Sequence, residues 1–248
     1  MFNLFRSKHK EPASLCFSTD IHCHIVPGID DGAPDAATSA DLVERMQSWG
    51  ISRIIASPHV TQYTFENTPQ TIGPALAQLQ EELKSRGNDI EVSHAAEYRI
   101  DDLFLEHLGK MELMPLPGDF LLIENAFMQE PWNLDQLVFD LQVKGFRPIL
   151  ALPERYRYYY MKKNRYQELH NAGLLFQINL LSLAKSYGKE ECKIAEYLIA
   201  NGLVDFVGTD LHRKSQADTI DSYLRTPDAH KHMDDLRGNL LNDKVVKQ

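Results

Sequence analysis

The stretch DAATSADLVERMQSWGISRIIASP, residues 35–58, contains a helix, a glycine and a strand in succession. Helical spacing of apolar residues runs from Asp35 to Trp49 and stops at Gly50, where a left-handed C-cap would end the helix. Residues 52–58 follow as a short run that is rich in apolar and β-branched side chains. A helix that leads through a glycine into a strand is the repeating unit of parallel α/β folds.

The same unit recurs along the chain. The candidate strands are residues 16–22, 52–58, 89–97, 119–124, 147–152, 174–180 and 204–210. The candidate helices, each followed directly by a glycine, are residues 35–49, 68–86, 133–144 and 189–201. This alternation predicts a single α/β domain built as a TIM-like (β/α) barrel. A doubly wound open sheet is the alternative, but the sequence has neither a GxGxxG nor a GxxxxGK[ST] motif to favour it.

Length and charge narrow the class of protein. The 248 residues are 43% hydrophobic and 25% charged, which suits one compact domain. The net charge of −9 argues against nonspecific binding to nucleic acids. The three cysteines suggest no disulfide framework, so we expect a cytoplasmic protein, and we expect no membrane span. We predict an N-terminal extension over residues 1–16 and one domain over residues 17–248. The oligomeric state stays open.

Imidazoles and carboxylates stand where the candidate strands end, which is where parallel α/β folds place their chemistry. These residues are His22, His24, His59, Glu97, Glu124, Asp210 and His212. Because side chains alternate along a strand, His22 and His24 point to the same side and Cys23 points to the other. A lone histidine is more often structural than a ligand. So many ionisable groups in one place, however, would repel one another unless cations lay among them, and the pattern therefore predicts a metal centre.

The kinds of ligand indicate the metal and the chemistry. Mixed imidazole and carboxylate ligands suit Mn, Zn or Fe, whereas calcium takes oxygen ligands alone. Several sets of ligands at one mouth indicate more than one ion. Clustered ions are typical of enzymes that hydrolyse phosphate esters.

Six motifs, in order, resemble those of the polymerase and histidinol phosphatase (PHP) superfamily. They are DIHCHIVPGIDDG (20–32), SPH (57–59), AAEY (95–98), LIEN (122–125), PERY (153–156) and GTDLH (208–212). The similarity is greatest to its branch of bacterial manganese-dependent protein-tyrosine phosphatases, which are linked to capsular and exopolysaccharide synthesis. The resemblance implies a distorted seven-stranded (β/α) barrel, the PHP fold, with two to three ions. Mn²⁺ is the ion expected first, with Fe or Zn as alternatives.

The resemblance also implies roles for individual residues. By motif matching, the first ion is held by His22, His24, Glu97 and Asp210, and the third by Asp31, His59 and His212. Glu97 would bridge to a second ion near Glu124. Asp31 rather than Asp30 occupies the ligand position, which leaves Asp30 to shape the turn. The expected catalytic residues are Arg155, which would grip the substrate phosphate with its bidentate fork, Asp210 and His212.

One motif departs from the family pattern at Leu152. Family members have a histidine ligand before the PER motif, whereas this chain reads ALPERY. Leucine offers no lone pair, so the second ion would keep chiefly Glu97 and Glu124. Three interpretations follow: an impaired or two-metal phosphatase, a catalytically silent binding protein, or a laboratory substitution that traps a ligand.

The predicted reaction is hydrolysis of a phosphomonoester by a water that the metal activates, with a phosphotyrosine protein, such as a bacterial tyrosine-kinase tail, as substrate. No cysteine begins the CxxxxxR loop of cysteine-based tyrosine phosphatases. The alternatives are a phosphotyrosine-binding protein without activity and a histidinol-phosphate-type phosphatase or nuclease. The tyrosines of RYRYYY (155–160) suggest an aromatic wall for the substrate ring, although such clusters usually bury one another. Asn179 and Ser182 are predicted either to line the mouth or to cap and connect.

Overall fold

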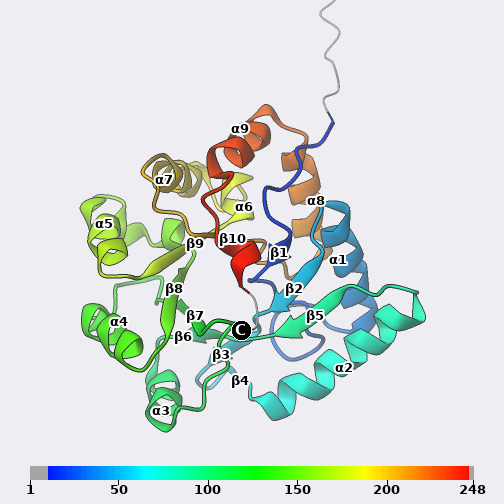
Figure 1. Cartoon of the computed structure of the whole chain (residues 1–248), viewed down its shortest axis with the longest axis horizontal. Coiled ribbons are helices and arrows are strands. Elements are labelled where there is room, and N and C mark those ends of the chain that lie inside the picture. Colours follow the sequence, from blue (N-terminus) through cyan, green and yellow to red (C-terminus); the bar gives the residue numbers. More distant parts are fainter. Residues whose placement is uncertain (1–10, 246–248) are drawn as a thin grey trace, which may run out of the picture.

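A computed structural model describes residues 11–245, with the strands at the centre and the helices around them (Figure 1). The strands are β1 (Thr19–Asp20), β2 (Arg53–Ala56), β3 (His59–Thr61), β4 (Phe65–Glu66), β5 (Glu91–His94), β6 (Glu97–Arg99), β7 (Phe120–Glu124), β8 (Arg147–Ala151), β9 (Leu175–Asn179) and β10 (Phe206–Gly208). The helices are α1 (Ala36–Ser48), α2 (Pro69–Ser85), α3 (Asp102–Lys110), α4 (Leu134–Val143), α5 (Asn164–Asn171), α6 (Leu180–Leu183), α7 (Lys189–Ala200), α8 (Lys214–Leu224) and α9 (Pro227–Leu236).

The strand and helix predictions are confirmed, except that two candidate strands are interrupted and several helices were missed. Each candidate strand contains a strand, and the four candidate helices correspond to α1, α2, α4 and α7. The segment at residues 52–58 ends its ladder at β2, since Pro58 has no N–H to donate, and the chain pairs again in β3. Helices α3, α5, α6, α8 and α9 were not predicted. In α5 only Tyr166 and Leu169 are buried, so its apolar periodicity is faint.

The strands form two sheets, in the orders β1-β2-β5 and β10-β9-β8-β7-β6-β3-β4. All named pairs are parallel except β3 with β4. The segments after β1 and β10 also meet, because the amide of Asp210 donates to the carbonyl of His22 (2.8 Å) and that of His24 to Leu211 (3.0 Å). The α/β class is therefore confirmed, while closure into one TIM-like barrel stays a prediction. So does the division at residue 16, and residues 1–10 of that extension lie outside the described residues.

Burial follows the expectation for parallel sheets covered by helices. All five residues of β7 are buried, as for a strand with both faces covered. Helix α2 buries Ile72, Ala75, Leu79 and Leu83 at helical spacing and leaves its polar side chains outside. The packed core thus fixes the positions of the carboxyl ends of the strands.

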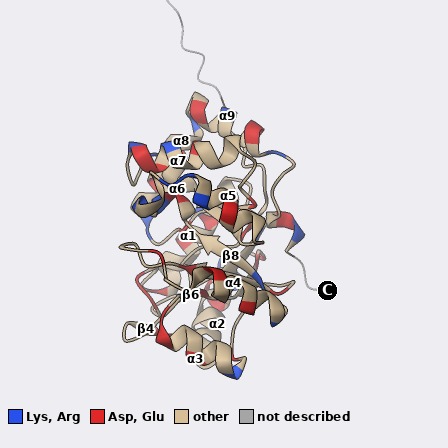
Figure 2. Ribbon diagram, turned by 90° about the vertical axis from the view of Figure 1, so that its left-hand side faces the viewer, with Lys and Arg blue, Asp and Glu red and all other residues tan. Residues whose placement is uncertain are grey.

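The surface carries both signs of charge. Figure 2 shows Lys and Arg mixed with Asp and Glu over the helices in that view. Among residues 11–245, no helix combines the length and the apolar character needed to cross a bilayer.

Gly208 of β10 provides a test of how closely the strands pack below the mouth. A Cβ at this position would lie 2.7 Å from the Cβ of His22 and 2.8 Å from Nε2 of Gln177. We expect Gly208→Ala to lower the free energy of unfolding by about 1–3 kcal/mol, because the crowded side chains must shift. Gly73→Ala is the control, since a Cβ there meets nothing within 4 Å and helix α2 gains propensity. Equal urea midpoints for the two variants would contradict this account.

Candidate metal centre

His22 is fixed in one tautomer by its neighbour in β9. Its Nδ1 lies 2.6 Å from Oε1 of Gln177, whose Nε2 donates in turn to the carbonyl of Ile178 (2.7 Å). The amide oxygen therefore faces His22, and Nδ1 must carry the proton. The lone pair of His22 is left on Nε2, where a metal ligand needs it.

His24 and His212 are oriented in the same way. Nδ1 of His24 lies 2.8 Å from Oδ2 of Asp30, and Nδ1 of His212 donates to the carbonyl of Asp210 at 2.8 Å. Each acceptor holds the Nδ1 proton and leaves Nε2 free. Asp30 also accepts from the amides of Gly32 (3.0 Å) and His59 (3.1 Å), so it both shapes the turn and positions a ligand.

The free imidazole nitrogens converge on two carboxylates. Nε2 of His22 and of His24 are 3.3 Å apart, and Oε2 of Glu97 lies 3.3 and 3.4 Å from them. Oδ1 of Asp210 lies 3.5 and 3.4 Å away. Both carboxylate oxygens of Glu97 are buried without a hydrogen-bond donor among the described residues. Lone pairs facing lone pairs in a buried place require a cation, and the donor set therefore fits a metal ion.

The pKa of His22 reports the same preference for positive charge. Burial lowers this pKa, but the carboxylates of Glu97 and Asp210 outweigh burial and raise it to about 9. The site accordingly favours a bound cation, whether a proton or a metal ion.

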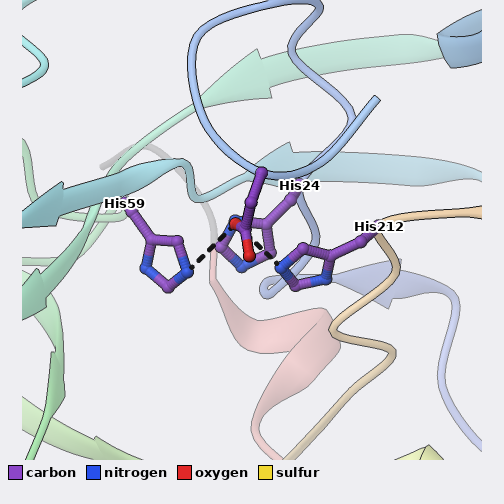
Figure 3. A group of neighbouring side chains, drawn as sticks. His24, His59 and His212 are labelled. Atoms are coloured by element: carbon purple, nitrogen blue, oxygen red, sulfur yellow. Dashed lines mark ion pairs between the residues drawn. The ribbon is translucent and has the colours of Figure 1, made fainter. Parts of the chain in front are cut away.

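A second set of ligand atoms lies beside the first. Oδ1 of Asp31 is 3.5 Å from Nε2 of His59 and 3.4 Å from Nε2 of His212. Figure 3 shows the imidazoles of His24, His59 and His212, which come from three separate segments, gathered around one point. The ligand atoms form two groups, His24 with Asp31, His59 and His212, and His22 with His24 and Asp210. His24 belongs to both groups, but its single Nε2 lone pair can serve only one ion at a time.

Glu124 stands apart from both groups. Its Oε2 lies 3.1 Å from NH1 of Arg99, and this guanidinium is its ion-pair partner. Burial, and then the charge of Glu97, raise the pKa of Glu124 to about 7. Leu152 forms an apolar part of the nearby wall. The structure thus brings together the expected first and third ligand sets but leaves the expected second set incomplete.

A cavity of about 230 Å³ opens over these groups. It is lined by Asp31, His59, Glu97, Glu124, Phe127, Leu152, Arg155, Tyr187, Asp210, His212, Arg213 and Gln216. The guanidinium of Arg155 lies between two rings, 4.0 Å from the centroid of Tyr187 and 4.7 Å from that of Phe127. Its NH1 is 3.9 Å from Oδ2 of Asp210. The arginine is therefore held at the cavity next to the cluster of ligands.

The aromatic wall predicted from RYRYYY is wrong. Tyr158, Tyr159 and Tyr160 do not line the cavity, whose aromatic residues are instead Phe127 and Tyr187. Tyr159 is buried in the core, and the half-buried Tyr158 and Tyr160 pack against it. The hydroxyl of Tyr158 donates to the carbonyl of Ala126, and that of Tyr160 to the carbonyl of Glu154. Aromatic clustering decided their position, as it usually does.

Two further residues tie Asp210 in place. Nδ2 of Asn179 donates to Oδ2 of Asp210 at 2.7 Å, while Oδ1 of Asn179 caps α6 by accepting from the amide of Leu181 at 2.8 Å. Asn179 therefore caps and connects, and it does not line the cavity. The hydroxyl of Tyr187 also donates to Oδ2 of Asp210 (3.2 Å). Tyr187, Gln177 and the positioning role of Asp30 were missed from the sequence, although a glutamine inside the apolar run of β9 was an available signal.

Ser182 lies beneath the mouth rather than on it. Its hydroxyl donates to Oε1 of buried Glu154 at 2.7 Å, and the amide of Asn179 donates to the same oxygen at 2.8 Å. Glu154 thereby joins the turn that carries Arg155 to the end of β9.

Comparison with known proteins gives the family. The family described as "Capsular polysaccharide synthesis, CpsB/CapC" matches residues 18–236. The chain belongs to this family. The CpsB/CapC relatives include the tyrosine-protein phosphatase YwqE of Bacillus subtilis, 35% identical over 194 residues, which are 78% of this chain and 76% of YwqE. The putative tyrosine-protein phosphatase CapC of Staphylococcus aureus is 31% identical over 78% of this chain and 76% of its own.

A solved CpsB/CapC structure has the same fold. It comes from work on YwqE of Bacillus subtilis and CpsB of Streptococcus pneumoniae, described as unique metal-dependent tyrosine phosphatases. It superposes with a TM-score of 0.73 at 30% identity and covers 93% of this chain and 97% of the solved one. The resemblance drawn from the six motifs is therefore confirmed.

Asp30 offers a test of the positioning of His24. We expect Asp30→Ala to weaken Mn²⁺ binding by about 10- to 100-fold, because His24 loses the acceptor that holds its Nδ1 proton. Asp30→Asn retains an acceptor oxygen and should recover most of the affinity, while Asp89→Ala changes an exposed carboxylate elsewhere. The measurement is calorimetric titration with Mn²⁺. Equal affinities for Asp30→Ala and Asp89→Ala would remove this role.

Glu154 offers a test by pH. Burial raises its pKa from 4.5 to about 7, so between these values the folded protein keeps a proton that the unfolded chain releases. The free energy of unfolding should therefore fall as pH rises through this window. Glu154→Gln mimics the protonated form and should be more stable than the parent by about 3 kcal/mol at pH 8, with little difference near pH 5. Urea unfolding at both pH values checks this, with exposed Glu81→Gln as control. The same difference at both pH values would contradict it.

Proposed function

We propose that this protein is a metal-dependent protein-tyrosine phosphatase that hydrolyses the phosphomonoester of a phosphotyrosine protein. The observation that carries the proposal is the convergence of free imidazole nitrogens and carboxylates at one cavity, directly beside Arg155. Its relatives named as tyrosine-protein phosphatases support it.

The proposed metal ligands form two sets. One ion would be held by His22, His24, Glu97 and Asp210, and the other by Asp31, His59 and His212. Mn²⁺ is the proposed metal, with Fe or Zn as alternatives that the same donors accept. When bound, such ions lower the pKa of water and neutralise the charge of a phosphoryl group.

Arg155 is proposed to bind the substrate phosphate. Its planar guanidinium can donate two hydrogen bonds to the nonbridging oxygens, and Phe127 and Tyr187 hold it in one orientation. The same two rings give the cavity apolar walls, which suit the phenyl group of phosphotyrosine better than the short side chain of phosphoserine.

Asp210 and His212 are the other proposed catalytic residues. Asn179 and Tyr187 hold Oδ2 of Asp210, so its Oδ1 faces the imidazoles. Asp210 also has a left-handed backbone with φ of 49°, a conformation rare for residues other than glycine and often retained at functional sites. His212, held through Nδ1, presents Nε2 to the mouth.

A cysteine nucleophile has no support in the site. Cys23 is fully buried, and burial raises the pKa of its thiol well above the usual value. A thiol in this state is a poor source of thiolate. Its side chain packs in the hydrophobic core, away from the cavity residues.

The substrate and setting are proposed at the level of the family. The phosphotyrosine-bearing tail of a bacterial tyrosine kinase in polysaccharide synthesis is the proposed substrate, and the cytoplasm is the proposed location. The proposed closure of the strands into one distorted barrel rests on the backbone contacts between the segments after β1 and β10.

Leu152 favours one second candidate, a phosphotyrosine-binding protein without activity. Leucine adds no ligand to the cavity wall, and a site with fewer ions would still bind a phosphate through Arg155. The candidates differ in turnover, not in binding.

The test is Mn²⁺-dependent release of phosphate from a phosphotyrosyl peptide. We expect turnover that chelation abolishes and Mn²⁺ restores, and a loss of about 100-fold or more in kcat/KM for Arg155→Ala, since the variant lacks the fork for the transferring group. Cys23→Ala should keep the parental rate. Loss of turnover in Cys23→Ala with unchanged metal content would contradict the mechanism.

Comparison with Leu152→His decides between the two candidates. If the parent binds the peptide but only Leu152→His releases phosphate, the protein is a binder. Turnover by the parent at a rate within about 10-fold of that of Leu152→His supports the phosphatase. Changes around metal ligands lower activity by about 10- to 100-fold, so a loss of about 10-fold or less is at the small end of this range.

A further inference from the structure

Arg99 and Glu124 are paired by the sheet itself. Strand β6 runs parallel to β7 in a register that sets Arg99 beside Glu124, both at strand ends. The side chain of Glu124 is only 7% exposed, and its Oε2 lies 3.1 Å from NH1 of Arg99. This guanidinium is therefore a cationic partner of Glu124 within the chain.

No complete set of metal ligands surrounds Glu124. Among residues 11–245, neither group of three or more clustered ligands includes it. The same cavity is lined by Glu97 and His59, which already face other ligand atoms, and by Leu152, which has no donor atom. Because Glu97 and His59 serve the other ligand sets, Glu124 lacks the three protein ligands that transition-metal sites use.

The backbone at Leu152 is unusual for a leucine. Its φ is 55°, in the left-handed region where bulky side chains are rare and Asn, Asp and His are enriched. The amide of Leu152 donates to the carbonyl of Gln177 (2.9 Å), and its own carbonyl accepts from the amide of Arg155 (2.9 Å). Backbone hydrogen bonds therefore hold this turn, and the side chain of Leu152 packs in an apolar cluster.

We propose that the protein binds two metal ions and that no third ion binds beside Glu124. The guanidinium of Arg99 instead supplies the positive charge that a third ion would give there. This inference rests on the proposed metal dependence. Leu152 has no donor atom to complete the ligand set of such an ion. Arg99 forms the ion pair that a buried, charged Glu124 requires. Arg99 also lies 6.0 Å from the ring of Phe127, the ring that contacts Arg155, so its charge stays next to the proposed phosphate site.

The experiment measures bound manganese and melting temperature together, using the full chain. After saturation with Mn²⁺ and desalting, elemental analysis should give two ions per chain for the parent and three for Leu152→His. Arg99→Ala should keep two ions but lower Tm by about 5 °C or more, because Glu124 loses its partner. Arg99→Lys retains the charge and should recover most of the Tm.

The double variant Arg99→Ala with Leu152→His gives the decisive comparison. Added Mn²⁺ should restore its Tm toward that of Leu152→His, since the third ion now partners Glu124, whereas added Mn²⁺ should not restore Arg99→Ala alone. Three ions in the parent, an unchanged Tm in Arg99→Ala, or equal Mn²⁺ effects on the two Arg99→Ala proteins would each overturn the inference. A parent that binds no manganese would instead overturn the proposed function.

Discussion

Buried carboxylates that face imidazole lone pairs constrain the arrangement of all the side chains at the carboxyl ends of the strands. Glu97 lies within 3.4 Å of nitrogens from three histidines, and its two oxygens have no hydrogen-bond donor among the described residues. Burial without a cation would be strongly unfavourable, so the arrangement depends on positive charge from outside the chain. The packed strands bring these groups together. Hydrogen bonds from Nδ1 of His22 to Gln177 and from Nδ1 of His24 to Asp30 keep both Nε2 atoms directed toward Glu97.

The fold was predictable where the apolar pattern was strong. Runs such as Phe120–Glu124, buried on both faces, stand out as parallel strands, and glycines mark the ends of the predicted helices. The breaks between β2 and β3 and between β5 and β6 were not predicted, because ladder pairing depends on partners distant in sequence. Short polar helices such as α5 were missed for a related reason: two buried side chains give too little periodicity to recognise.

The site was predictable as a set of residues but not as a set of contacts. Strand ends and six ordered motifs indicated His22, His24, His59, Glu97, Glu124, Asp210 and His212. The sequence could not show that Glu124 pairs with Arg99, since this depends on the register of β6 and β7. Nor could it show that Phe127 and Tyr187 hold Arg155, because the two rings come from loops whose conformations depend on tertiary packing.

Asn179 links the cavity to the local stability of helix α6. One side chain both caps α6, through the amide of Leu181, and holds Asp210. Any ligand that fixes Asp210 also fixes Asn179, and thereby lowers the chance that the first turn of α6 opens. Occupancy of the mouth is therefore linked to local unfolding, and the exchange of the Leu181 amide hydrogen with solvent reports it from a residue that does not line the cavity.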